Sequence, residues 1–217
     1  MSEATERLIE RLAGEAEPVR RLPPPLLRAG LWLLAVAAAF AAAVLFFADV
    51  PEFVRRARDP RQVVELAATV LTGVAAIVAA FQLSLPDRSP LWSLLPLPAL
   101  FLWLASSGYG CYSGFLALGH DDGSLAESSH CFRFIIGFSV PLAISLLVLL
   151  RRAAPLSPVR VAAVGGLGVA AIAAFALQFF HPFDVTFLDL GVHIVAIGLV
   201  IAGMSLAERL SPAPQAA

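Results

Sequence analysis

Six long apolar stretches constrain this sequence more than any other feature. A helix that crosses a bilayer needs about 20 predominantly apolar residues. Six stretches reach or approach that length: residues 27–47, 63–83, 91–109, 132–150, 159–179 and 186–206. The chain is 59% hydrophobic and 14% charged, whereas soluble domains average about 25% charged residues. The pattern predicts an all-α fold, a polytopic membrane helical bundle with about six transmembrane helices.

The stretches divide the chain into three parts. We expect residues 1–26 to form a cytoplasmic N-terminal tail with a short amphipathic helix, residues 27–206 the six-helix transmembrane domain, and residues 207–217 a cytoplasmic C-terminal tail. Acidic residues precede the first apolar stretch, so residues 1–26 do not resemble a signal peptide, which opens with a basic segment. The net charge of −1 predicts no direct nucleic-acid partner.

The arginines suggest an orientation. With the N-terminus inside, ten of them fall in inner segments and five in outer segments, which is the bias of cytoplasmic loops. We therefore expect a multi-pass protein of the bacterial inner membrane with both termini in the cytoplasm. The first outer loop disagrees with this orientation because it holds four arginines, although acidic residues lie close by.

The tail carries an apolar stripe. Leu8, Ile9 and Leu12 fall on one face at helical spacing. A helix this short is marginal alone in water, so the stripe needs the membrane interface or a groove on a partner to cover it. Arg20 and Arg21 follow; they serve either as topology anchors or as contacts to acidic residues of that partner.

The two cysteines of the chain, Cys111 and Cys131, fall in the third predicted loop with His120 and His130. Adjacent ends of a helical hairpin can lie close enough for a disulfide, and an extracytoplasmic compartment permits one. Thiolate and imidazole also suit zinc and other thiophilic metals, although no C-x-x-C motif is present. We expect no resident cofactor. A structural disulfide, a redox sensor and a transient heavy-metal site at these four residues all remain open.

Further ionisable residues lie on the same predicted side. His181 and Asp184 fall in the fifth loop and are further sensing candidates. Asp189 and His193 are four residues apart at the start of the last apolar stretch. Ionisable residues in a membrane are costly and usually face the bundle interior. The last two form either an intramembrane polar pair that locks helix packing or part of a sensing or relay site.

Several short motifs together resemble the NrsF family. They are Leu8-Ile9, Leu12-Ala13, Pro18-Val19-Arg20-Arg21-Leu22, Pro24-Pro25, Arg28-Ala29, Trp32, one cysteine in each half of the third loop, and His181-Pro182 with Asp184. The resemblance covers essentially the whole chain. It implies a six-helix inner-membrane anti-sigma factor without enzymatic activity.

The resemblance also implies a partner and a signal. An extracytoplasmic-function sigma factor would be held at the membrane through the cytoplasmic segments, with Leu8, Leu12, Arg20 and Arg21 as contact candidates. A stress felt outside through Cys111 and Cys131 would release it. The inducing signal, the identity of the sigma factor and the oligomeric state remain open.

Two other function classes are weighed against this one. A small-molecule or metal permease could use Asp189, His193 and Glu65 as a polar pathway, but no inverted repeat is evident. A membrane thiol oxidoreductase generally needs a reactive pair with a quinone or a second thiol pair, and the chain has two cysteines.

Overall fold

The computed structural model describes residues 3–15, 22–48, 50–118, 125–180 and 186–211, and these are almost entirely helical. The elements, in chain order, are α1 (Glu3–Glu15), α2 (Pro25–Phe47), α3 (Val50–Arg56), α4 (Pro60–Leu83), the 3₁₀ helix η1 (Pro90–Leu94), α5 (Leu97–Leu118), α6 (Leu125–Arg151), α7 (Pro158–Phe180) and α8 (Phe187–Leu210). Six spans are long and apolar enough to cross a membrane, formed by α2, α4, η1 with α5, α6, α7 and α8. The predicted all-α bundle of about six such helices is confirmed.

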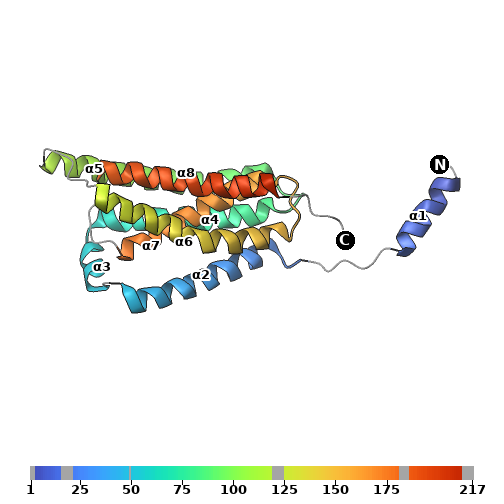
Figure 1. Cartoon of the computed structure of the whole chain (residues 1–217), viewed down its shortest axis with the longest axis horizontal. Helices are drawn as coiled ribbons and strands as arrows, with labels where there is room; N and C mark the ends of the chain where they lie inside the picture. The colour runs from blue at the N-terminus through green and yellow to red at the C-terminus, as the bar shows by residue number, and fades with distance from the viewer. Residues whose placement is uncertain (1–2, 16–21, 49, 119–124, 181–185, 212–217) are drawn as a thin grey trace.

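Helix α7 forms the centre of the bundle. In its most apolar window, 72% of the residues are buried, against α4, α6 and α8 (Figure 1). Two glycines permit this close approach. A Cβ atom on Gly168 would lie 2.8 Å from Ile77 Cδ1, and one on Gly166 would lie 2.9 Å from Ile201 Cα. Small residues let membrane helices pack closely, so the glycines of α7 set the spacing of its neighbours.

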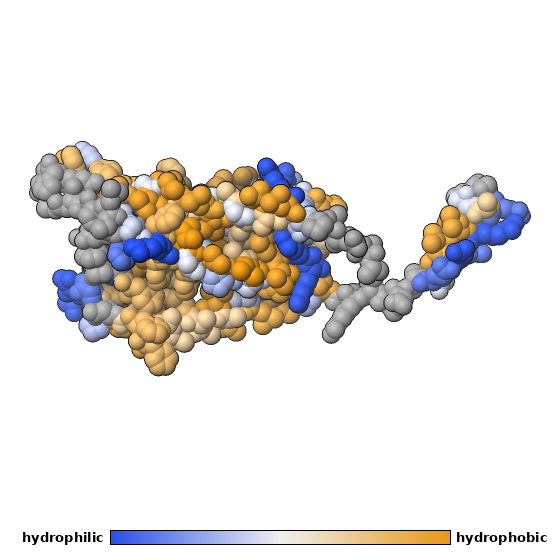
Figure 2. Space-filling view, viewed as in Figure 1, coloured by the Kyte–Doolittle hydropathy of each residue, from blue (hydrophilic) through white to orange (hydrophobic). Residues whose placement is uncertain are grey.

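Helix α2 lies at the edge of the bundle (Figure 1). Its buried residues are Arg28, Ala29 and Trp32, all in its first half. The second half contacts α7 through Phe40, whose ring lies 5.0 Å from that of Phe179 between centroids. Figure 2 shows an apolar surface along the bundle with hydrophilic residues gathered at its two ends. Hydrocarbon can solvate such an apolar surface without any cover from the chain itself.

The helices on either side of residues 119–124 are longer than expected. The third span was expected to end at residue 109 and the fourth to begin at residue 132, but α5 extends to Leu118 and α6 begins at Leu125. The Gly and Ser residues of this region indicated a loop. In an apolar surrounding, helical hydrogen bonds outweigh those local preferences because an unpaired backbone group is costly there. Cys111 and Cys131 therefore lie within helices rather than in a loop.

Candidate functional site

The two ends of the bundle differ in chemistry. We call the end where α5 and α7 finish and α8 starts the cysteine end, because Cys111 and Cys131 lie there. We call the opposite end, where α2 starts and α8 finishes, the tail end. Since each long helix crosses the bundle once, residues of the cysteine end come from the last part of α2 and from α3, α4, α5, α6, α7 and α8.

A capping box starts α8 at the cysteine end. The Thr186 side chain accepts a hydrogen bond from the Asp189 backbone N–H at 3.2 Å, and the Asp189 carboxylate accepts one from the Thr186 N–H at 3.3 Å. The same carboxylate accepts a hydrogen bond from Ser128 Oγ of α6 at 2.5 Å. Asp189 is buried, so its carboxylate both caps α8 and joins α8 to α6.

Cys111 is attached to this cap. Its Sγ donates a hydrogen bond to the Thr186 carbonyl oxygen at 3.3 Å, and its residue is only 2% exposed. Any change that removes the thiol proton or enlarges the sulfur therefore acts directly on the first residue of the α8 cap.

Cys131 has an apolar surrounding. It is 5% exposed and belongs to a buried cluster with Ile135 of α6, Ala173 and Leu177 of α7, and Ala196 of α8. The two cysteines thus come from α5 and α6, and both belong to groups of residues that include α8. Neither sulfur can gain a substituent without displacing packed atoms, because protein interiors hold few voids.

Asp189 and His193 are linked in a different way from the one expected. His193 Nδ1 lies 2.6 Å from the Asp189 backbone oxygen; since a carbonyl can only accept, Nδ1 is the donor. The Asp189 carboxylate is engaged by Thr186 and Ser128 instead. The aspartate side chain therefore joins two helices, whereas the histidine bonds within α8.

A small polar chamber lies next to His193. Its volume is about 30 Å³, and its polar lining residues are Glu65, Ser107, Gln178 and His193. Ser107 Oγ donates to Glu65 Oε1 at 2.7 Å. Such a space holds about one water molecule when several polar groups face it. The chamber extends the polar groups of the cysteine end into the interior between α4, α5, α7 and α8.

Of the remaining predicted sensing residues, His130 alone is among those that the structure describes. His130 lies on α6 and is exposed, whereas His120, His181 and Asp184 lie outside the described residues. Within the parts of the chain that the structure describes, no three His, Cys, Asp or Glu side chains form a group that could hold a metal.

The tail helix presents the predicted apolar stripe. Leu8, Ile9 and Leu12 on α1 are 51–58% exposed, and α1 buries none of its residues over Glu3–Glu15. Ion pairs join Arg7 to Glu3 at 3.1 Å and Arg11 to Glu15 at 3.0 Å. Figure 2 shows apolar residues along one side of α1 and hydrophilic residues along the other. Arg20 and Arg21 lie outside the described residues.

Sequence reasoning missed several residues of the site. Thr186 and Ser128 were not singled out, although the spacing Thr186-x-x-Asp189 matches a capping box, an N-terminal signal that can be read from sequence. Ser128 gave no such signal, because its partner Asp189 lies 61 residues further along the chain. At the tail end, Arg28 and Trp32 were quoted for the resemblance without a structural role.

A comparison with protein families matches residues 12–211 to a family described as NrsF, negative regulator of sigma F. No curated protein matches the chain, and no solved structure does.

Proposed function

The chain belongs to the NrsF family, the negative regulators of sigma F, and we propose that it is a membrane anti-sigma factor for an extracytoplasmic-function sigma factor. In this proposal the bundle lies in the bacterial inner membrane, the tail helix holds the sigma factor in the cytoplasm, and the cysteine end faces outward. A redox or metal stress at Cys111 and Cys131 releases the sigma factor. The family match favours a regulator over a permease or an oxidoreductase.

The exposed stripe of α1 supports the tail as the binding segment. A short helix with an uncovered apolar face suits a groove on a partner protein, and its charged face stays in water. Deleting residues 1–22 leaves the N-cap Pro24 and all of α2 in place. We expect this deletion to abolish co-purification of the cognate sigma factor while the bundle still folds. Undiminished capture by the truncated chain would contradict the tail assignment.

The bond from Cys111 to Thr186 is the observation that supports the cysteines as the sensor. In the redox form of the proposal, the two sulfurs join as a disulfide, and two protons and two electrons pass to an oxidant outside the membrane. In the metal form, a thiophilic metal ion replaces both thiol protons. Either event removes the S–H group that donates to Thr186, so both signals act on the α8 cap.

The sensor is tested with Cys111→Ser and Cys131→Ser, separately and together. A serine at position 111 keeps a donor for the Thr186 carbonyl, so retention of the sigma factor should survive. Release by diamide, an oxidant, or by cadmium ions should be lost, as measured by transcription from a sigma-dependent promoter. Diamide and cadmium applied separately distinguish the redox form from the metal form. A full response of the double variant to both would refute sensing by the cysteines.

Orientation is tested with a membrane-impermeant maleimide on intact cells whose outer membrane is permeabilised. Because both cysteines are buried, labelling is carried out in mild denaturant, with Ser129→Cys as an extra, less buried target on the same turn of α6. Labelling before the inner membrane is opened supports an outward cysteine end. Labelling only afterwards would reverse the topology.

A further inference from the structure

Helix α6 makes hydrogen bonds to α8 at one end of the bundle and to α2 at the other. At the cysteine end, it supplies Cys131 and the Ser128 hydroxyl that bonds to Asp189 at 2.5 Å. At the tail end, Ser145 Oγ accepts a hydrogen bond from Trp32 Nε1 at 3.1 Å, and the Leu149 carbonyl accepts one from the Arg28 guanidinium. Fourteen residues separate Cys131 from Ser145, which is about 21 Å of α-helix.

The tail-end contacts hold α2, the helix that leads into the tail. We call the Trp32–Ser145 and Arg28–Leu149 bonds the α2 clamp. The clamp residues Arg28 and Trp32 are two of the three buried residues of α2, and the Arg28 guanidinium also lies over the Phe81 ring at 5.1 Å. Helix α2 packs mainly against α4, and the clamp adds two hydrogen bonds that join its tail-end half to α6.

The middle of α6 contains a weak point. Pro141 lies inside the helix and has no N–H, so the carbonyl four residues earlier, on Gly137, loses its helical donor. Sharp bends in helices occur at such prolines. Close to it, the Ser139 hydroxyl is buried and stands among the few side-chain polar groups in the described residues with no hydrogen-bond partner. In contrast, the Ser145 hydroxyl, one turn after Pro141, donates a hydrogen bond to the Leu142 carbonyl at 2.9 Å.

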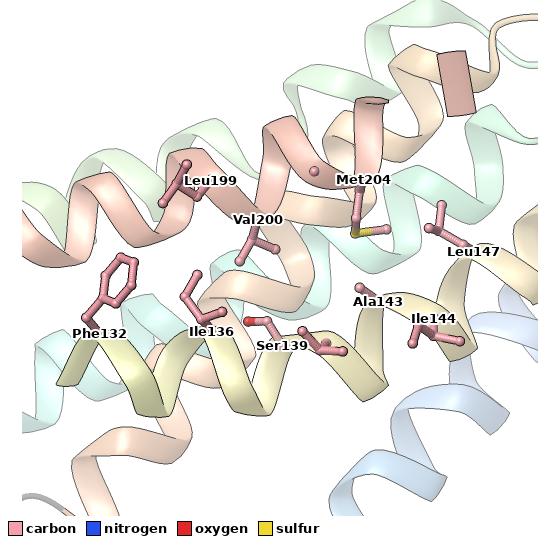
Figure 3. Close-up of a pocket in the computed structure, with 11 residues that line it drawn as sticks. Phe132, Ile136, Ser139, Ala143, Ile144, Leu147, Leu199, Val200 and Met204 are labelled. Atoms are coloured by element: carbon pink, nitrogen blue, oxygen red, sulfur yellow. The ribbon is translucent and has the colours of Figure 1, made fainter. Parts of the chain in front are cut away.

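A groove beside this weak point leaves α6 room to move. It lies between α6 and α8, has a volume of about 370 Å³, and is lined almost entirely by apolar side chains (Figure 3). Ile136, Ser139 and Ala143 of α6 face Leu199, Val200 and Met204 of α8 across it (Figure 3). Packed helices resist displacement because their side chains interdigitate, and here that contact is incomplete next to Pro141.

We propose that α6 carries the signal from the cysteine end to the tail by bending at Pro141 and opening the α2 clamp. A change at Cys131 or at the Ser128–Asp189 bond displaces the first half of α6. The second half then draws Ser145 and Leu149 away from Trp32 and Arg28. Helix α2 and the tail attached to it change position, and the sigma factor is released. This inference rests on the proposed function for its outcome, but the movement itself can be measured without a partner.

The movement is tested on the full chain in lipid nanodiscs, labelled with 5-fluorotryptophan. The chain has three tryptophans, so fluorine NMR gives a small set of signals, which Trp32→Phe and Trp92→Phe assign. Alkylation of the cysteines by N-ethylmaleimide should shift or split the Trp32 signal and leave that of Trp92, on η1, in place. Mass spectrometry verifies modification of Cys131. An unchanged Trp32 signal on the modified protein would refute the proposal, whatever the sigma factor does.

The hinge is tested with Pro141→Ala. Alanine restores an N–H donor for the Gly137 carbonyl and should stiffen α6, so the Trp32 shift on alkylation should fall several-fold while the unmodified protein still retains the sigma factor. Pro98→Ala is the matched control, because Pro98 lies in the first turn of α5, where no helical hydrogen bond is lost. A wild-type shift in Pro141→Ala would exclude a hinge at this residue.

The clamp is tested with Ser145→Ala, which removes the acceptor for Trp32. Loss of one hydrogen bond should weaken retention of the sigma factor about fivefold without any thiol modification. Ser205→Ala is the control, since the Ser205 hydroxyl donates within α8, to the Ile201 carbonyl at 2.7 Å. Equal retention by the two variants would show that the clamp does not control the tail. Loss of tail capture in the deletion experiment tests the proposed function separately.

Discussion

Helices α7 and α1 differ in whether other helices of the chain cover their apolar side chains. Helix α7 buries 72% of its most apolar window against other helices of the chain, and its glycines allow those helices to approach closely. Helix α1 buries none of its residues over Glu3–Glu15, so Leu8, Ile9 and Leu12 stay exposed. The chain therefore completes its own core around α7 and leaves the α1 stripe for another surface to cover.

This difference predicts that the stability of the bundle and the affinity for the partner depend on different residues. Residues around α7 should set the free energy of unfolding of the bundle, and residues on α1 should set only the affinity for the partner. The lipid-facing helices, such as α2, are an intermediate case, because hydrocarbon rather than protein covers most of their surface. Substitutions can test whether this division holds.

Replacing both Leu8 and Leu12 by Asp should produce the largest effect. Burial of one leucine contributes about 1.5–3 kcal/mol, so loss of two should weaken capture of the sigma factor more than about 100-fold. The thermal midpoint of the bundle should not change. Glu6→Ala with Glu10→Ala, on the charged face of α1, is the control and should retain capture. A drop in the thermal midpoint for Leu8 and Leu12 would show that α1 belongs to the bundle.

Asp189→Ala should strongly destabilise the bundle itself. The substitution removes the carboxylate that accepts from the Thr186 N–H in the capping box and leaves the buried Ser128 hydroxyl without its acceptor, at a combined cost of about 3 kcal/mol. Denaturant titration in bicelles measures the loss. Asp189→Asn keeps an acceptor and should cost less. If the alanine variant matched the wild type, the carboxylate would not be a structural element of the cysteine end.

Gly166→Ala tests the packing of α7 at a smaller scale. The added Cβ would lie 2.9 Å from the Ile201 Cα of α8, and such overpacking costs about 2 kcal/mol. Gly198→Ala, on α8, has no atom within 4 Å of the added Cβ and should leave stability unchanged. The same titration compares them, and equal stability of the two variants would mean that α7 and α8 can separate freely.

The smallest effect should come from Glu52 on α3, outside the membrane spans. A hydrogen bond from Arg55 lowers the pKa of Glu52 below its ordinary value. A lowered pKa stabilises the fold at pH values above the ordinary one, and that stabilisation is lost as the pH falls through the lowered pKa. Solvent screens this exposed pair. Thermal midpoints of wild type and Glu52→Gln should differ slightly at neutral pH and converge in acid; a gap that widens in acid would reverse the sign.

The candidate site was only partly accessible from the sequence. The stripe of Leu8, Ile9 and Leu12 could be predicted because helical periodicity is local, and the three residues lie exposed on α1. Both cysteines were singled out as sensing candidates, a role that stays a prediction. Their environment was not foreseen, because Cys111 bonds to Thr186 75 residues away. The Asp189–His193 pair was expected from its spacing, yet the carboxylate turns to Ser128 of another helix.

The sequence by itself determined the six apolar spans and the amphipathic tail helix, since hydrophobicity and period act over a few turns of chain. The tertiary structure decided which of those helices lies at the centre, that α5 and α6 run past the cysteines, and that Arg28 reaches the carbonyl of Leu149, 121 residues later. Contacts of that kind depend on how side chains from separate helices fill a shared space. No local pattern encodes that packing.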